Sequence, residues 1–330
     1  MKNLAKEIIN GKRLGRNDDL SFFETADLAD LCEGADEIRA VLCGNHVDLC
    51  TIINGRAGRC RENCKFCAQS AHNHTDCDNY AMLDVDVVLA DCKEREAEGV
   101  HAYSIVTAGR TVEGEELDKL VGIYEKLNEE CNISLCASHG LLTKEAFKRI
   151  KDAGVKMYHC NIETSKRNFP NICTTHSYDD KIEEIKLAQE AGFTICSGGI
   201  IGMGETFEDR IDMAVSLKEL GVDSIPINAL MPIKGTPLGD LPRLTEDEIL
   251  RCVAMFRYIN PTAYIRIAAG RSYFADGGTR LFKSGANATI TGNMLTTVGN
   301  NTEQDFAMLK GMGFDLTSHR DDAGLKIAGV

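Results

Sequence analysis

The chain lacks an excess of basic residues. It contains 37 lysines and arginines against 50 aspartates and glutamates, which gives a formal net charge of −13 at pH 7. Nucleic acids and anionic membranes are bound by surfaces on which cations cluster, because their own charge is negative. We therefore expect neither as a partner, and the composition favours a protein that acts on small molecules.

Long hydrophobic runs are also lacking. No apolar stretch reaches the length of a membrane span, and residues 1–20 mix charged and polar side chains without an apolar core. We therefore expect a cytoplasmic location. In a reducing compartment the 14 cysteines stay as free thiols, so we interpret them as metal ligands or small buried residues. Those without partner spacing are expected to pack or lie on the surface: Cys32, Cys43, Cys77, Cys92, Cys131 and Cys252.

The sequence has no low-complexity linker, and no Gly-x-Gly-x-x-Gly motif follows its first β-rich run, which argues against a dinucleotide crevice. Short β-rich runs instead alternate with amphipathic runs. Strands are predicted at 49–54, 102–107, 133–138, 156–162, 194–199, 224–230, 264–268 and 288–291, and helices at 84–98, 114–130, 143–152, 178–191, 206–220, 246–258, 271–283 and 303–312. This α/β pattern predicts a (β/α)8 TIM-type barrel over residues 48–314, with an N-terminal helical segment at 1–47 and a C-terminal tail at 315–330.

Three cysteines are closely spaced after the first predicted strand, as Cys60-x3-Cys64-x2-Cys67, with Phe66 just before the last. Three thiolates can hold three irons of a four-iron cluster and leave the fourth iron open to a small molecule. A zinc knuckle or three unrelated core thiols is the alternative, but structural zinc sites usually fill all four positions. The triplet resembles the signature of the radical S-adenosylmethionine (radical SAM) enzymes.

A barrel gathers residues from the carboxyl ends of its strands into one site. Cys136, Cys160 and Cys196 fall on three neighbouring predicted strands, and Cys173 follows the fourth strand in a loop. They predict a second metal site, although strand cysteines can also be buried hydrophobic residues. Arg266 would point to the same region, where it needs an anionic partner such as a cluster or Glu163.

Two further segments belong to this predicted site. Asn161 and Glu163 are two residues apart on an extended strand and therefore face the same side. Their amide and carboxylate suit a urea-like group and ribose hydroxyls, although an ordinary strand-end network is the alternative. The glycine-rich residues 197–205, which include Ile200, let the backbone approach a ligand, and no Lys-Ser/Thr follows to make a phosphate loop.

Between residues 49 and 314 the chain resembles the biotin synthase family of radical SAM enzymes. The motifs that carry the resemblance, in order, are Cys60-x3-Cys64-x2-Cys67, Cys136-Ala-Ser-His-Gly140, Tyr158-His-Cys-Asn-Ile-Glu163, residues 195–206, Ile225-Pro-Ile-Asn228, Lys234-Gly-Thr-Pro237, residues 264–271 and Leu295-Thr-Thr297. The resemblance implies a sulfurtransferase that converts dethiobiotin to biotin. It also implies a SAM-binding four-iron cluster, SAM itself and an auxiliary iron–sulfur cluster that donates sulfide.

The resemblance also implies roles for single residues. Cys60, Cys64 and Cys67 would hold the catalytic cluster; Asn161, Glu163 and Ile200 would bind SAM; and His159, Asn161 and Asn228 would bind substrate. Cys136, Cys196 and Arg266 would hold the auxiliary cluster. The family has a further cluster cysteine on the second strand, where this chain has Ser104. Our hypothesis is that Cys160 and Cys173 compensate, so that the auxiliary cluster is a two-iron or a larger, four-iron type.

The resemblance further implies a flavodoxin-type or ferredoxin-type electron donor and a homodimer. Two other functions fit the same motifs. The chain could be a related radical SAM enzyme, such as one of the hydrogenase-maturation type, which acts on a different small molecule. It could also be a non-catalytic iron–sulfur carrier, which would form no 5′-deoxyadenosine from SAM.

Overall fold

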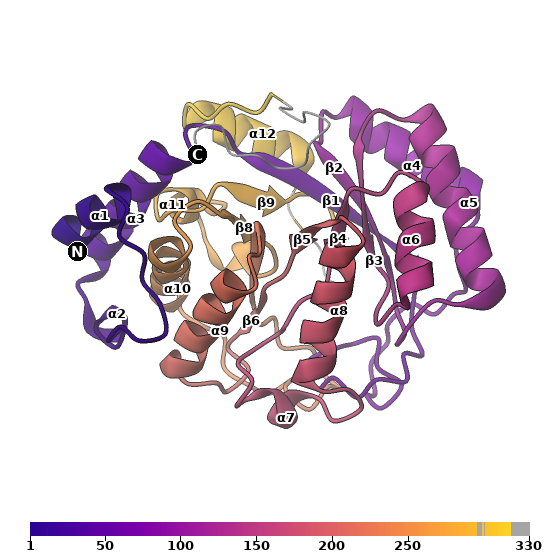
Figure 1. The fold of residues 1–330 in the computed structure, drawn as a ribbon, viewed down its shortest axis with the longest axis horizontal. Helices are drawn as coiled ribbons and strands as arrows, with labels where there is room; N and C mark the ends of the chain where they lie inside the picture. The colour runs from indigo at the N-terminus through magenta and orange to yellow at the C-terminus, as the bar shows by residue number, and fades with distance from the viewer. Residues whose placement is uncertain (296–298, 300, 318–330) are drawn as a thin grey trace.

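The computed structural model describes residues 1–295, 299 and 301–317. A barrel of parallel strands lies at the centre of the molecule and helices surround it (Figure 1). The strands are β1 (Asp48–Arg56), β2 (Ala102–Thr107), β3 (Ser134–Ser138), β4 (Met157–His159), β5 (Thr194–Cys196), β6 (Gly199–Ile201), β7 (Ser224–Ala229), β8 (Tyr264–Ile267) and β9 (Ala288–Ile290). The predicted (β/α)8 fold is confirmed.

The nine strands occupy eight positions around the barrel. They follow the order β5-β4-β3-β2-β1-β9-β8-β7-β6, and a pairing between β5 and β7 closes the ring. The strand predicted at 194–199 is therefore divided in two, because β5 pairs with β4 whereas β6 pairs with β7. Gly198 and Gly199 permit this break: a Cβ on Gly198 would lie 1.9 Å from Pro226 O, and one on Gly199 would lie 2.4 Å from Glu163 O.

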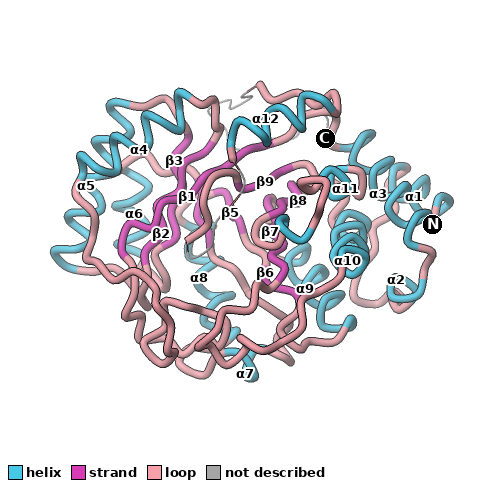
Figure 2. Tube along the Cα trace, turned by 180° about the vertical axis from the view of Figure 1, so that it is seen from behind, coloured by secondary structure: helices cyan, strands magenta, loops and turns pink. Residues whose placement is uncertain are grey.

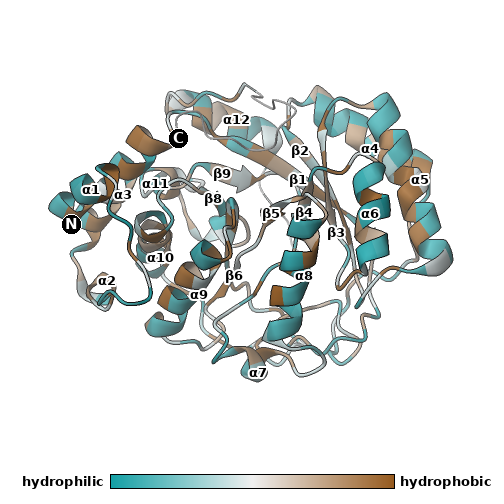
Figure 3. Ribbon diagram, in the orientation of Figure 1, coloured by the Kyte–Doolittle hydropathy of each residue, from teal (hydrophilic) through white to brown (hydrophobic). Residues whose placement is uncertain are grey.

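Helices cover the outside of the barrel with their apolar faces turned inward (Figure 3). They are α4 (Val85–Ala97), α5 (Gly114–Glu130), α6 (Lys144–Asp152), α8 (Tyr178–Glu190), α9 (Phe207–Glu219), α10 (Glu246–Ile259), α11 (Thr279–Phe282) and α12 (Thr302–Gly311). The short helix α7 (Phe169–Ile172) lies at one end of the barrel instead. Three helices precede the barrel: α1 (Lys2–Ile9), α2 (Phe22–Thr25) and α3 (Leu28–Leu42). Of these, α3 packs against α1 and α10, so the N-terminal segment covers one side of the barrel wall.

One predicted helix is wrong. Residues 271–283 contain only the 3-10 turn η1 (Arg271–Tyr273) and the short helix α11. Gly277 and Gly278 lie between them with φ angles of +68° and +95°, which a right-handed helix does not permit. The short helix α7 was not predicted. The tail predicted at 315–330 falls largely outside the described residues, as do Thr296 and Thr297.

The connections after the strands gather at one end of the barrel, next to α7, at the lower edge of Figures 1 and 2. This is the carboxyl end of the strands, where barrel enzymes place their sites. No helix within the described ranges has the length and apolarity to cross a membrane.

Candidate active site and cysteine groups

The cysteine triplet lies in the loop that follows β1. Its backbone is held by two bonds that Cys60 makes, from its N to Gln69 O (2.9 Å) and from Ala71 N to its O (2.7 Å). The three thiols are partly exposed. Burial raises the pKa of Cys67 to about 11, although the backbone N–H groups of Gln69 and Ser70 favour its thiolate. A metal ion would deprotonate such a thiol, so the donor set fits an iron–sulfur cluster.

Cys173 belongs to this loop group. Its Sγ lies 3.8 Å from Cys64 Sγ and 3.3 Å from His176 Nδ1. The Cys64 thiol donates a hydrogen bond that holds the pKa of Cys173 below its usual value, and His176 adds to the effect. The three donors are close enough together to hold one ion. The structure thus does not bring Cys173 to Cys136 and Cys196, because α7 returns the chain to the triplet loop.

Cys160 is also separated from the barrel cysteines. Its thiol donates a 2.8 Å hydrogen bond to Glu184 Oε2 of α8, and Lys181 Nζ lies 3.9 Å from its sulfur. Burial raises the pKa of the Cys160 thiol. The neighbouring His159 instead faces the barrel interior, where its Nδ1 lies 3.4 Å from Ser104 Oγ. The structure therefore does not bring together the four thiols predicted to form one site, which are Cys136, Cys160, Cys173 and Cys196.

Inside the barrel, Cys136 and Cys196 pack with a third cysteine, Cys50 of β1, in one buried cluster. The exposed fraction of each residue is 2% or less. Cys50 is a candidate ligand that the sequence analysis missed. A signal was available, since the predicted strand 49–54 contains it, but sequence does not fix which barrel residues share a level.

Arg266 of β8 lies beside these thiols. Its guanidinium forms a buried ion pair with Asp48 and donates to Thr289 O (3.1 Å) and Ser224 Oγ (3.3 Å). The neighbouring anionic groups raise the pKa of Arg266 despite its burial. Its carboxylate partner is thus Asp48 of β1, not the Glu163 considered from the sequence.

A cavity of about 410 Å³ opens at the carboxyl end of the barrel. Its wall includes residues of both cysteine groups and all the predicted SAM and substrate residues. They are Cys50, Cys67, His159, Cys160, Asn161, Glu163, Cys196, Ile200, Asn228 and Arg266. The volume is within the range of small-molecule sites.

Glu163 is a buried acid of this cavity whose pKa is strongly shifted. Burial raises its pKa to about 7, and its Oε2 has no hydrogen-bond partner within the described part of the chain. Its φ of +67° is strained for a residue with a side chain, and bonds from Glu163 N to Gly198 O (3.1 Å) and from Ile200 N to Glu163 O (2.8 Å) hold it. A buried acceptor without a donor fits a ligand that brings hydroxyl groups.

The two amides of the cavity are positioned by the broken strand. Asn161 Oδ1 accepts from Gly198 N (3.1 Å), while Asn228 Nδ2 donates to Gly199 O (3.2 Å). Asn228 Oδ1 also accepts from Ala269 N (3.2 Å). These bonds fix the orientation of both side chains before any ligand binds.

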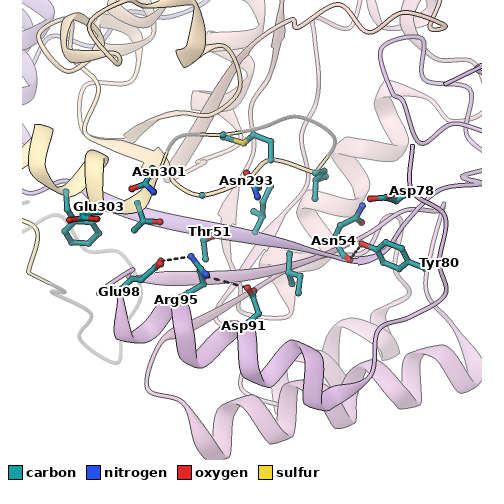
Figure 4. Close-up of a pocket in the computed structure, with 18 of the residues that line it drawn as sticks. Thr51, Asn54, Asp78, Tyr80, Asp91, Arg95, Glu98, Asn293, Asn301 and Glu303 are labelled. Carbon is teal, nitrogen blue, oxygen red and sulfur yellow. Dashed lines mark hydrogen bonds and ion pairs between the residues drawn. The ribbon is translucent and has the colours of Figure 1, made fainter. Parts of the chain in front are cut away.

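A second, larger hollow of about 1030 Å³ lies outside the barrel between β1, α4 and α12 (Figure 4). Its described wall is polar and includes the ion pairs of Arg95 with Asp91 and Glu98. The wall contains none of the predicted site residues. We therefore assign it no function.

Comparison with known proteins identifies the family of this chain. The radical SAM superfamily profile matches residues 56–229, and the biotin and thiamin synthesis associated domain matches residues 226–315. Biotin synthase of Clostridium beijerinckii is 67% identical over 96% of this chain and 100% of its own length. The chain belongs to the biotin synthase family. It is thus a radical SAM enzyme and a sulfur-inserting transferase, as predicted.

A second relative, biotin synthase of Alkaliphilus metalliredigens, is 65% identical over 96% of this chain and 99% of its own length. Among solved structures, methylornithine synthase has a TM-score of 0.83 at 20% identity and covers 96% of this chain and 97% of its own. The hydrogenase maturase HydG of Carboxydothermus hydrogenoformans has a TM-score of 0.78 at 16% identity, covering 95% of this chain and 79% of its own. At these identities the two structures support the fold alone.

Proposed function

We propose that this chain converts dethiobiotin to biotin in the cavity at the carboxyl end of the barrel. The observation that carries the proposal is that one cavity is lined by the triplet cysteine Cys67, the polar residues Asn161, Glu163 and Asn228, and the barrel cysteine Cys196. A radical source, a binding surface and a sulfur source can therefore face one substrate. When bound, the clusters and SAM supply the chemistry, namely a 5′-deoxyadenosyl radical that abstracts hydrogen from unactivated carbon and a sulfide that closes the ring.

Separate residues bind the catalytic cluster and SAM. Cys60, Cys64 and Cys67 hold the SAM-binding cluster. Glu163 accepts hydrogen bonds from the ribose of SAM through its free Oε2, while Ile200 and Asn161 contact the rest of that molecule. The buried wall keeps water and stray hydrogen donors away from the reacting carbon.

On the substrate side, we assign His159, Asn161 and Asn228 to dethiobiotin. An amide that both donates and accepts is complementary to a ureido ring. The backbone bonds of Asn228 orient it in advance, which lowers the entropy that is lost on binding. Cys136, Cys196 and Arg266 belong to the auxiliary cluster site, which supplies the sulfur.

The remaining partners are assigned by family. The electron donor is of the flavodoxin or ferredoxin type, the enzyme is a homodimer, and it works in the cytoplasm. Gel filtration of the anaerobic protein tests the second assignment, since a homodimer has twice the 36.1 kDa mass of the chain.

The test of the function is an anaerobic assay of the reconstituted protein with SAM, dithionite and dethiobiotin. We expect biotin and 5′-deoxyadenosine together. Formation of 5′-deoxyadenosine without biotin favours a radical SAM enzyme with a different substrate, as in the hydrogenase-maturation alternative. No 5′-deoxyadenosine at all favours an iron–sulfur carrier and contradicts the proposal.

A further inference from the structure

We infer that Cys50 is the third thiolate ligand of the auxiliary cluster, together with Cys136 and Cys196. The inference rests on the proposed function and extends it, because it explains how the chain holds this cluster with Ser104 at the usual cysteine position of β2. It replaces the predicted compensation by Cys160 and Cys173.

The strand register places the three cysteines at one level of the barrel. Cys50 pairs with Ala102 of β2, Ala102 pairs with Ser134 of β3, and Cys136 lies two residues further along β3. This step crosses two neighbouring strands through paired residues and then advances two residues along the chain. Residues related by it form one interior layer, because such a layer takes its side chains from alternate strands. Repeating the step leads in turn to Cys196, to Arg266 and back to Cys50.

This layer has four members, and three of them are cysteines. Cys50 makes a side-chain contact with Cys136, and both thiols are buried. Cys50, Cys136 and Cys196 pack in one buried hydrophobic cluster with Ala102 and Met157. Cys50 and Cys196 also line the cavity, so a group held by the layer would be open to a substrate there.

Ser104 belongs to the next layer. It pairs with Cys136, and the same step from Ser104 leads to His159, whose Nδ1 lies 3.4 Å from Ser104 Oγ. A cysteine on β2 would therefore approach the cluster from the carboxyl side, whereas Cys50 approaches it from β1 at the level of the other two thiols. The chain thus keeps three thiols around the site but takes one from a different strand.

The spacing and charge of the layer fit a cluster. Two thiolates on one tetrahedral ion lie about 3.8 Å apart, given metal–sulfur bonds of about 2.3 Å. Among described residues, the groups of three donors within 4.8 Å of one another do not include this layer. A wider set suits several irons, and the guanidinium of Arg266 supplies positive charge beside an anionic, sulfide-rich group.

Iron and acid-labile sulfide counts on anaerobically reconstituted protein test the inference. We compare Cys50→Ser with Cys136→Ser and with Cys252→Ser, a matched control in which a buried cysteine of α10 outside the layer is changed. We expect Cys50→Ser and Cys136→Ser to lose most of the iron beyond the four ions of the triplet cluster. We expect Cys252→Ser to keep it. Circular dichroism and thermal melting of the three variants show whether each barrel is folded.

A Cys50→Ser protein with wild-type iron and sulfide would overturn the inference. If this variant does not fold, iron-edge anomalous scattering from crystals of the reconstituted wild type decides. We expect an iron at about 2.3 Å from Cys50 Sγ, and iron near Cys136 and Cys196 but not near Cys50 overturns it. Failure of the proposed function is distinguishable, since it appears as wild-type protein that makes no biotin whatever its iron content.

Discussion

The two cysteine groups of this enzyme are built in opposite ways. Cys60, Cys64 and Cys67 come from one loop and are partly exposed, whereas Cys50, Cys136 and Cys196 come from three strands and are buried. The loop group depends on local spacing and on a few backbone bonds. The barrel group depends on the register of the whole sheet. Under the proposed function, this difference places SAM, which must enter and leave, at the accessible loop group and the sulfur source at the enclosed barrel group.

Removal of a loop cysteine should have the largest effect. Cys64→Ala leaves an iron of the triplet cluster without its thiolate, so we expect 5′-deoxyadenosine and biotin formation to fall below detection. Anaerobic turnover assays measure this, and Cys77→Ala, a partly buried cysteine further along the same loop, is the control. If the barrel group is independent, auxiliary iron remains in Cys64→Ala; its loss would show that the two groups assemble together.

Removal of the buried charge beside the barrel group should lower the stability of the protein more than removal of a surface charge. Arg266→Met removes the guanidinium that pairs with the buried carboxylate of Asp48, and we expect the free energy of unfolding of the iron-free protein to fall by about 3–5 kcal/mol. Urea denaturation measures this. Adding Asp48→Asn should recover part of the loss. Arg280→Met, which breaks a surface pair with Glu246, should cost less than about 1 kcal/mol; equal losses would contradict the interpretation.

Substitution of Glu163 should have a smaller, pH-dependent effect on the affinity for SAM. Its folded-state pKa is raised from 4.5 to about 7 by burial, so it becomes a carboxylate only as the pH rises through 7. We expect SAM affinity, measured by equilibrium binding, to increase over that interval. In Glu163→Gln we expect it to be about tenfold weaker at pH 8 and flat with pH.

The same shift predicts a change in stability with a definite sign. The unfolded carboxyl ionises near pH 4.5 but the folded one near 7, so ligand-free stability falls between these values, by up to about 3 kcal/mol. Glu163→Gln should therefore unfold at higher temperature than wild type at pH 8 but not at pH 4.5. Substitution of the exposed Glu115 by Gln is the control. If Glu163→Gln melts at the same temperature as wild type at pH 8, the buried carboxylate does not destabilise the protein as predicted.

Cys173→Ala should have the smallest effect of these changes on the barrel group. Cys173 contacts Cys64 rather than the barrel layer, so we expect the auxiliary iron content to equal that of wild type. Iron and sulfide counts on reconstituted protein measure this. A loss of auxiliary iron in Cys173→Ala would restore the grouping predicted from sequence and remove the distinction between the two groups.

Much of this architecture was predictable because it is encoded locally. The predicted strand 102–107 and helix 114–130 coincide with β2 and α5, since periodicity and composition decide each of them. The helix predicted at 271–283 failed where two glycines adopt positive φ angles. The strand predicted at 194–199 failed because pairing partners, not propensity, divide it into β5 and β6.

The sequence by itself determined the alternation of strands and helices and the cysteine triplet, because those signals act over one turn, one strand or one loop. Only the tertiary structure decided that Cys173 joins the triplet loop and that Cys50 faces Cys136 and Cys196. The physical reason is that the stagger of the closed sheet sets which residues meet inside a barrel. That stagger is a property of all its strands together.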